Sequence, residues 1–300
     1  MFDLRYHVAS LAAVFLALVI GILLGVGISS GGFVSKGERS ILNGRIDQLE
    51  GELDAARVRT GDLTRAQRAA ETYVEQSYPL LMADRLSRRR IALVFVGPVD
   101  AELRSLVERT LVDAGAGATL RMRAIRVPLD FDSLGGMLER RPALARYARP
   151  EAARDLGRRL AQELVRGGKA PMWRLLSPQL VAERSGNDEL AADGVVVARS
   201  VAPQRGTTSR VLRGFYEGLA SSGAPAVGVE TSRASPTAVD AFDKASLSSV
   251  DYLDTEVGRL ALALLLEGAR PGSYGLKATA TDGVLPPLSP VAPQARSGER

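Results

Sequence analysis

The sequence predicts an α/β protein in which an amino-terminal transmembrane helix and a short coiled coil precede a mostly parallel, three-layer α/β domain. Three observations support this prediction. Residues 8–28 form an uncharged apolar run, a heptad pattern of apolar residues begins at Leu42, and short apolar runs alternate with helical patterns from residue 91 onward. The corresponding domains are residues 1–37 for the anchor and a joint, 38–78 for a coiled-coil helix, 85–282 for the α/β domain and 283–300 for a disordered tail.

The predicted membrane span runs from Val8 to Ile28 and contains no charged side chain. Its 21 residues would form a helix of roughly 32 Å, which matches a hydrocarbon core of about 30 Å. A cleaved signal sequence usually has an apolar region of only about 7–15 residues. The length therefore favours a retained anchor in contact with membrane lipid, while the small residues Gly25, Gly27 and Ser29 leave cleavage open as the alternative.

The charges that flank the span do not settle its orientation. Arg5 precedes it, and Lys36 and Arg39 follow it, so neither side has a clear excess of positive charge. A single span followed by a long domain most often delivers that domain out of the cytoplasm. We therefore expect a single-pass protein of the cell membrane with its carboxyl-terminal domain on the extracytoplasmic side.

Small residues form a regular ridge within the span. Ala9, Ala13, Ala17, Gly21 and Gly25 recur every four residues and lie along one face of a helix. Such a face lets two helices approach closely in lipid, so it favours pairing of two spans. The alternative is that alanine and glycine are simply common in membrane helices.

A coiled-coil pattern follows the span. Its apolar seam comprises Leu42, Ile46, Leu49 and Leu53, which are spaced alternately by four and three residues. Heptad position g then holds Arg45 and Glu52. In a parallel partner these residues face Glu50 and Arg57 at position e, so both pairs carry opposite charges. The pattern predicts a parallel homodimer, and an amphipathic helix docked on its own domain is the alternative.

The α/β domain is predicted from alternating strands and helices. Tyr78-Pro79 ends or bends the coiled-coil helix, and IALVFVG (91–97), bounded by Gly97-Pro98, is typical of a buried parallel strand. The predicted strands are 91–97, 119–125, 194–201, 225–230 and 247–250, and the predicted helices are 100–113, 151–166, 208–221, 236–242 and 252–267. Residues 126–150 contain three prolines and are predicted to be irregular. Gly268 is expected to follow the last helix as its C′ residue.

Composition excludes several classes of function. The net charge is +5, but acidic and basic residues are interspersed and no basic stripe carries interleaved aromatic residues, so we expect no nucleic-acid partner. The chain has no cysteine, and His7 beside the span is its single histidine. Disulfides, thiolate chemistry, histidine-based triads and histidine zinc sites are therefore excluded from the soluble part. We expect no enzymatic activity.

Asp251, Asp254 and Glu256 are the candidate metal ligands. They follow the last predicted strand, and ligand sites in open α/β sheets prefer the carboxyl ends of strands. The alternative is structural, since Asp251 or Thr255 can cap the next helix and acidic residues suit the first turn of a helix.

Other candidate residues have weaker patterns. Gly97-Pro98 lacks a phosphate-binding glycine motif and is predicted to be a structural turn. Met122, Met137 and Met172 are scattered, so they bind Cu(I) only if the fold gathers them. Trp173 is interpreted as a packing anchor.

Two segments resemble a known family. One is LRYHVASLAAVFLALVIGILLGVGI, which leads into the coiled coil, and the other is SVDYLDTEVGRLALALLLEGARPGSYGLK (249–277). In the second, Asp251 and Asp254 precede Gly258-Arg259, and a Gly-x-Tyr-Gly turn follows at 272–275. Together they resemble the actinobacterial copper transporter family of the MctB kind, and the resemblance covers about residues 3–277.

The resemblance implies an envelope protein with a role in copper ion homeostasis or efflux. Copper is the one cofactor it implies, and the family label also includes an outer-membrane location. Members of the SteB type imply an alternative, a scaffold for cell-envelope assembly or division that binds a partner protein.

Overall fold

The computed structural model describes residues 4–30 and 36–288, which fall into two units, Met1–Ala70 and Glu71–Arg300. The first unit contains helix α1 (Leu4–Ser30) and most of helix α2 (Lys36–Met82). Part of the joint predicted before residue 38, residues 31–35, lies outside the described residues.

Helix α2 continues past the proline that was predicted to end or bend it. Pro79 lies inside the helix, and its carbonyl accepts a hydrogen bond from the Ala83 amide at 3.1 Å. Met82 and Leu86 are fully buried in the core of the second unit. Burial of these side chains stabilises the chain after Pro79 and offsets the backbone hydrogen bond that proline removes. The helix therefore continues past Pro79 and reaches Met82.

The described residues of the second unit form one seven-stranded sheet. Its strands are β1 (Ile91–Val96), β2 (Arg121–Ile125), β3 (Val181–Gly186), β4 (Gly194–Arg199), β5 (Ala226–Val229), β6 (Ser248–Val250) and β7 (Ser273–Tyr274). The strand order is β3-β2-β1-β4-β5-β6-β7, and every neighbouring pair is parallel except β2 and β3. The predicted α/β fold with a mostly parallel sheet is thereby confirmed.

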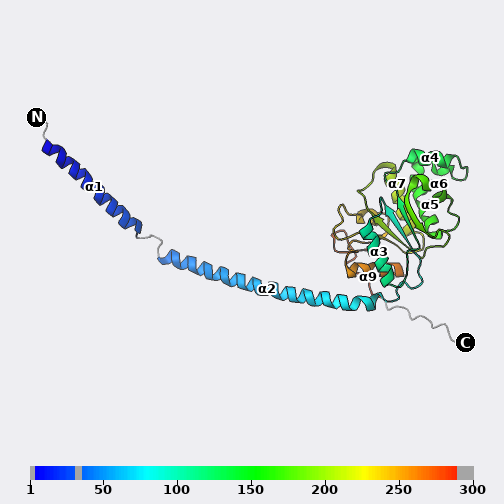
Figure 1. Ribbon diagram of the computed structural model, residues 1–300, viewed down its shortest axis with the longest axis horizontal. Helices are drawn as coiled ribbons and strands as arrows, with labels where there is room; N and C mark the ends of the chain where they lie inside the picture. Colours follow the sequence, from blue (N-terminus) through cyan, green and yellow to red (C-terminus); the bar gives the residue numbers. More distant parts are fainter. Residues whose placement is uncertain (1–3, 31–35, 289–300) are drawn as a thin grey trace. The chain divides into compact units, whose positions relative to one another are not determined.

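Helices cover both faces of this sheet. They are α3 (Ala101–Asp113), α4 (Phe131–Glu139), α5 (Ala153–Arg166), α6 (Pro171–Leu180), α7 (Gly206–Ala220), α8 (Val239–Asp243) and α9 (Glu256–Glu267), with two short 3₁₀ turns at Ala145–Tyr147 and Pro150–Ala152. α3 and α9 cover one face, and α4 to α8 cover the other (Figure 1). Gly268 caps α9 in the left-handed conformation that the sequence predicts.

The side chains of strand β1 contribute to two apolar cores, one on each face of the sheet. Its side chains alternate, so Ala92, Val94 and Val96 pack under α5 and α7 while the intervening residues pack under α3 and α9. α5 and α7 pack very closely, because a Cβ atom on Gly157 would lie only 2.0 Å from the Val211 carbonyl oxygen. An apolar cluster therefore lies on each face of the sheet, between the strands and the helices, which is the three-layer arrangement.

Four elements were not predicted: α4, α6, β3 and β7. Residues 126–150 are not wholly irregular, because α4 forms between the prolines and Asp130 caps it by accepting hydrogen bonds from Ser133. Strand β3 lacks alternation, since every residue after Val181 is exposed. Its pairing with β2 depends on contacts distant in sequence.

The predicted tail begins with residues that contact the domain. The Val284 carbonyl accepts a hydrogen bond from the Tyr252 hydroxyl, Leu285 packs against the core, and Pro286 is buried. Residues 289–300 lie outside the described residues.

Candidate functional site

The predicted membrane span lies on α1. His7–Val26, a stretch of 20 residues, is long and apolar enough to cross a membrane, and none of it is buried by the rest of the described chain. Gly21 and Gly25 have no atom within 4 Å of where a Cβ would lie, so the ridge of small residues is open along the helix.

The predicted seam lies on α2. Leu42, Ile46, Leu49 and Leu53 are each at least half exposed in the single chain. The charged residues beside the seam have neighbours on the same helix: Arg57 pairs with Asp54 at 3.2 Å, and Glu52 accepts a hydrogen bond from Gln48 at 2.9 Å. The seam is therefore an uncovered apolar stripe in the described chain.

Asp251 holds the end of the Gly-x-Tyr-Gly turn through hydrogen bonds to its carboxylate. It is only 1% exposed at the end of β6, and it accepts hydrogen bonds from the Leu276 amide at 2.9 Å and the Lys277 amide at 3.1 Å. A Cβ atom on Gly275 would lie 2.0 Å from the Asp251 Oδ1 atom. The turn thus needs glycine at this position because the carboxylate fills the space.

Asp254 and Glu256 each have a different partner. Asp254 accepts hydrogen bonds from the Ser232 amide at 2.8 Å and hydroxyl at 2.6 Å. Burial opposes ionisation of Asp254, but these hydrogen bonds outweigh it and hold its pKa below the usual range. Glu256 pairs with Arg259 at 2.8 Å.

The three carboxylates therefore do not converge on a shared partner. Thr255, one of the two expected caps, begins α9 by accepting a hydrogen bond from the Gly258 amide at 3.0 Å. Within residues 4–30 and 36–288, no group of three histidine, cysteine, aspartate or glutamate side chains is suited to hold a metal ion.

A buried ion pair at the same edge of the sheet was not predicted. Glu230 follows β5, is 2% exposed, and pairs with Lys277 at 2.5 Å. It also accepts hydrogen bonds from the Ala238 amide at 2.6 Å and the Thr237 hydroxyl at 2.7 Å. These contacts tie the end of the family-like segment to β5, so this edge is held by structural interactions.

The chain is closely packed at the place where a doubly wound fold binds nucleotides. Strand order reverses between β1 and β4, which locates this place at Gly97 and Ser200. A Cβ atom on Gly97 (φ +107°) would lie 2.5 Å from a methyl carbon of Val201. The Ser200 hydroxyl donates a hydrogen bond to the Pro98 carbonyl at 2.5 Å. Gly97-Pro98 is accordingly packed as a structural turn.

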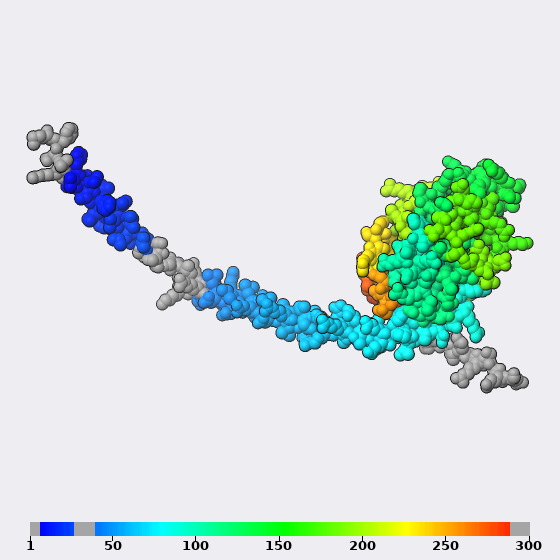
Figure 2. All heavy atoms as spheres, viewed as in Figure 1, coloured from blue at the N-terminus to red at the C-terminus, as the bar shows by residue number. Residues whose placement is uncertain are grey.

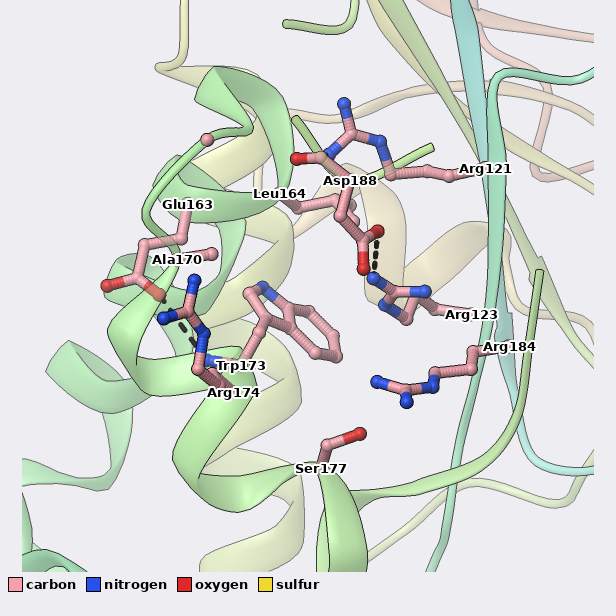
Figure 3. A pocket seen from close by; sticks show the side chains of 11 residues that line it. Arg121, Arg123, Glu163, Leu164, Ala170, Trp173, Arg174, Ser177, Arg184 and Asp188 are labelled. Atoms are coloured by element: carbon pink, nitrogen blue, oxygen red, sulfur yellow. Dashed lines mark hydrogen bonds and ion pairs between the residues drawn. The ribbon is translucent and has the colours of Figure 1, made fainter. Parts of the chain in front are cut away.

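A different pocket, which we call the arginine pocket, opens at the β2–β3 border of the sheet (Figure 3). It belongs to the part of the domain drawn in green in the space-filling view, which includes α5 and α6 (Figure 2). The cavity measures about 110 Å³ and is lined by Arg121, Arg123, Glu163, Leu164, Gly168, Ala170, Trp173, Arg174, Ser177, Arg184 and Asp188. No pattern in the sequence predicted this pocket.

Two of these arginines are buried within the layers. Arg121 and Arg123 are 2% and 6% exposed, and they lie on the face of β2 that α5 and α6 cover. Arg123 pairs with Asp188 and lies with its guanidinium carbon 5.9 Å from the centre of the Trp173 ring. Burial lowers the pKa of Arg121, with the charge of Asp188 opposing this effect.

Trp173 is held firmly in the wall of the pocket. Its indole nitrogen donates to the Leu160 carbonyl at 2.7 Å, and its amide donates to the Glu163 carboxylate at 3.3 Å. Its ring also packs edge-to-face against the Phe215 ring, with the two ring centres 6.4 Å apart. Trp173 is therefore both a packing anchor, as predicted, and part of a pocket lining.

The methionines are not gathered by the fold. Met122 packs in the core cluster on the α3 and α9 side of the sheet, whereas Met172 and Met137 belong to the cluster on the other side. The sheet separates Met122 from the other two, so these three do not form one soft-ligand site.

An apolar helix that fits a transmembrane anchor, followed by an α/β domain, defines a membrane-associated α/β protein. A family model described as "Copper transport outer membrane protein, MctB" matches residues 1–285, and the chain therefore belongs to the MctB family of copper transport proteins. Similar relatives are the copper transporters MctB of Mycobacterium tuberculosis (strain H37Rv) and Mycobacterium bovis. Each is 28% identical to this chain over an alignment that covers 92% of this chain and 96% of the relative.

Proposed function

We propose that the protein is a non-enzymatic, single-pass membrane protein that acts in copper homeostasis, with copper as its cargo. The observation that carries the proposal is the family match over residues 1–285, which includes the apolar helix and the α/β domain together. The curated relatives are named copper transporters and align over nearly their whole length.

The proposal places the α/β domain on the extracytoplasmic side of the membrane. One span followed by a long domain supports this orientation. A fusion of alkaline phosphatase to the carboxyl end tests it, because that enzyme is active only after export. An active fusion is expected, and an inactive fusion that is made in normal amounts would contradict the orientation.

The proposal also includes a parallel homodimer, in which the seam on α2 and the ridge on α1 pair in tandem. The four exposed apolar side chains of the seam support it, because two copies would remove them from water. The open Gly21 and Gly25 positions support close approach of two spans.

A copper-tolerance experiment tests the function. Cells that lack the gene are grown over a range of copper concentrations and complemented with the full chain or with Ile46→Asp, which would place two like charges opposite each other in the seam of a parallel dimer. We expect lower copper tolerance without the gene, restoration by the full chain, and weaker restoration by the variant. Zinc serves as the control metal, for which tolerance is expected to be unchanged.

Unchanged copper tolerance after deletion would contradict the copper role. In that case crosslinking in cells asks whether the domain holds an envelope or division protein, the scaffold role that the family resemblance leaves as the alternative.

A further inference from the structure

We propose that the arginine pocket binds a phosphate group, as the free ion or as the end of a larger phosphomonoester. Four arginines and two carboxylates line a cavity of about 110 Å³ in which Trp173 forms one wall (Figure 3). This inference concerns a site separate from the proposed copper role, and the two are tested independently.

The charge balance of the pocket favours an anion. Both acidic residues already have partners: Asp188 pairs with Arg123, and Glu163 accepts hydrogen bonds from the Met172 amide at 2.9 Å and from Arg159 at 3.0 Å. The four arginines and two carboxylates of the lining give it a formal charge of +2, which a phosphate dianion would balance.

The strand register places like charges opposite each other. Arg123 of β2 and Arg184 of β3 are direct partners across the antiparallel pair. Like charges in this arrangement destabilise a sheet. Asp188 forms an ion pair with Arg123, whereas Arg184 has no such partner among the described residues, so an anion beside Arg184 would relieve the remaining repulsion.

Hydrogen-bond donors remain unused in the pocket. The Arg121 Nε atom is buried and has no hydrogen-bond partner in the described part of the chain, although the other nitrogens of that guanidinium donate to the Asp188 and Leu190 carbonyls. Arg184 and Ser177 also have no side-chain partner within the described residues, and both line the cavity. Guanidinium groups match the geometry of phosphate oxygens, so these donors suit such a ligand.

The size of the cavity limits the ligand. Pockets for whole cofactors and drug-sized molecules usually measure about 300–1,000 Å³. A cavity of about 110 Å³ instead accommodates a single tetrahedral oxyanion. Any larger molecule would place one phosphate group in the pocket and leave the rest outside it.

The chain provides its own reporter for an experiment. Trp173 is the single tryptophan of all 300 residues, so intrinsic fluorescence of the full chain in a non-ionic detergent reports on this pocket. Inorganic phosphate and glycerol 1-phosphate are titrated separately at constant ionic strength, and calorimetry on the same samples detects binding that leaves fluorescence unchanged. The first probe represents the free ion, and the second represents a phosphorylated headgroup.

Arg184→Gln is the test variant, because its exposed side chain leaves the buried network intact. Arg140→Gln, at an exposed arginine outside the pocket, is the matched control. We expect saturable binding of at least one probe by the wild type and the control, and binding about tenfold weaker in Arg184→Gln.

The tighter-binding probe identifies the source of the phosphate group. Saturable binding of neither probe, by fluorescence or calorimetry, would overturn the proposal. Equal affinity in the wild type and Arg184→Gln would also overturn it, because binding would then occur outside the arginine pocket.

Discussion

The guanidinium of Arg259 on α9 lies against Tyr78 near the end of α2. Its Nε atom donates to the Tyr78 hydroxyl at 3.2 Å, its central carbon lies 5.1 Å from the ring centre, and the same hydroxyl donates to Asp113 on α3 at 2.8 Å. Three helices of the α/β unit are therefore joined at one tyrosine.

Arg259→Met should destabilise the α/β domain by about 1–3 kcal/mol, because it removes the hydrogen bond and cation–π contact with Tyr78 together with the ion pair to Glu256. Urea unfolding of the full chain, followed by Trp173 fluorescence, measures the effect. The matched control is Arg109→Met at an exposed position of α3. Equal midpoints for the two variants would show that these contacts of Arg259 contribute nothing.

Gly275→Ala should destabilise the domain by about 2 kcal/mol or more, because the added methyl group would overlap the buried Asp251 carboxylate. Gly136→Ala is the control, since nothing lies within 4 Å of its added Cβ and alanine suits a helix. Thermal unfolding of both variants checks the prediction. A melting temperature for Gly275→Ala that equals that of the control would refute the steric argument.

Glu217 should make the domain sensitive to acid. A hydrogen bond from Arg154 lowers the pKa of Glu217 from 4.5 to about 2, with burial opposing this and Arg213 and Arg158 adding to it. Since the folded pKa is depressed, the stabilisation is complete above pH 4.5 and is lost as the pH falls toward 2.

Glu217→Gln should therefore cost about 1–3 kcal/mol at pH 7 and progressively less between pH 4.5 and 2. Urea titrations at several pH values compare it with Glu151→Gln, an exposed glutamate. A cost that does not vary with pH would mean that the charge of Glu217 is not the source of its contribution.

The seam on α2 can be tested by cysteine crosslinking, because the chain has no cysteine of its own. Leu49→Cys occupies heptad position d, which faces the same residue in a parallel partner, whereas Gly51→Cys occupies the outward position f. Mild oxidation in membranes should yield a crosslinked dimer from Leu49→Cys and little from Gly51→Cys. Equal crosslinking at both positions would contradict the parallel seam.

Patterns that are local in the sequence predicted most of the α/β fold. The apolar run of β1 and the glycine that caps α9 carry strong signals because their burial and backbone conformation follow from a few adjacent residues. Strand β3 carries no such sequence signal, since its exposed residues show no alternation and the strand is held by pairing with β2. Such an edge strand is defined by a partner about sixty residues earlier in the chain.

The candidate site was harder to predict for the same reason. Asp251 was predicted to be a metal ligand or a helix cap, whereas in the structure it accepts hydrogen bonds from the amides of Leu276 and Lys277, which lie 25 and 26 residues further along the chain. The arginine pocket did leave one sequence signal. Arg121 and Arg123 alternate with apolar residues in a strand of a sheet that helices cover on both faces, where charged side chains are rarely tolerated without partners.

Strand β3 forms one edge of the sheet, and this edge affects whether copies of the protein associate with one another. Its unpaired backbone groups form a template onto which a strand from another molecule can add, and Glu183 and Arg184 place charge along it. Charges at such a border discourage intermolecular sheet growth, so neighbouring copies can stay dispersed. Replacement of both residues by valine would remove these charges, allow the edge to pair with strands of other molecules and make the protein prone to aggregate.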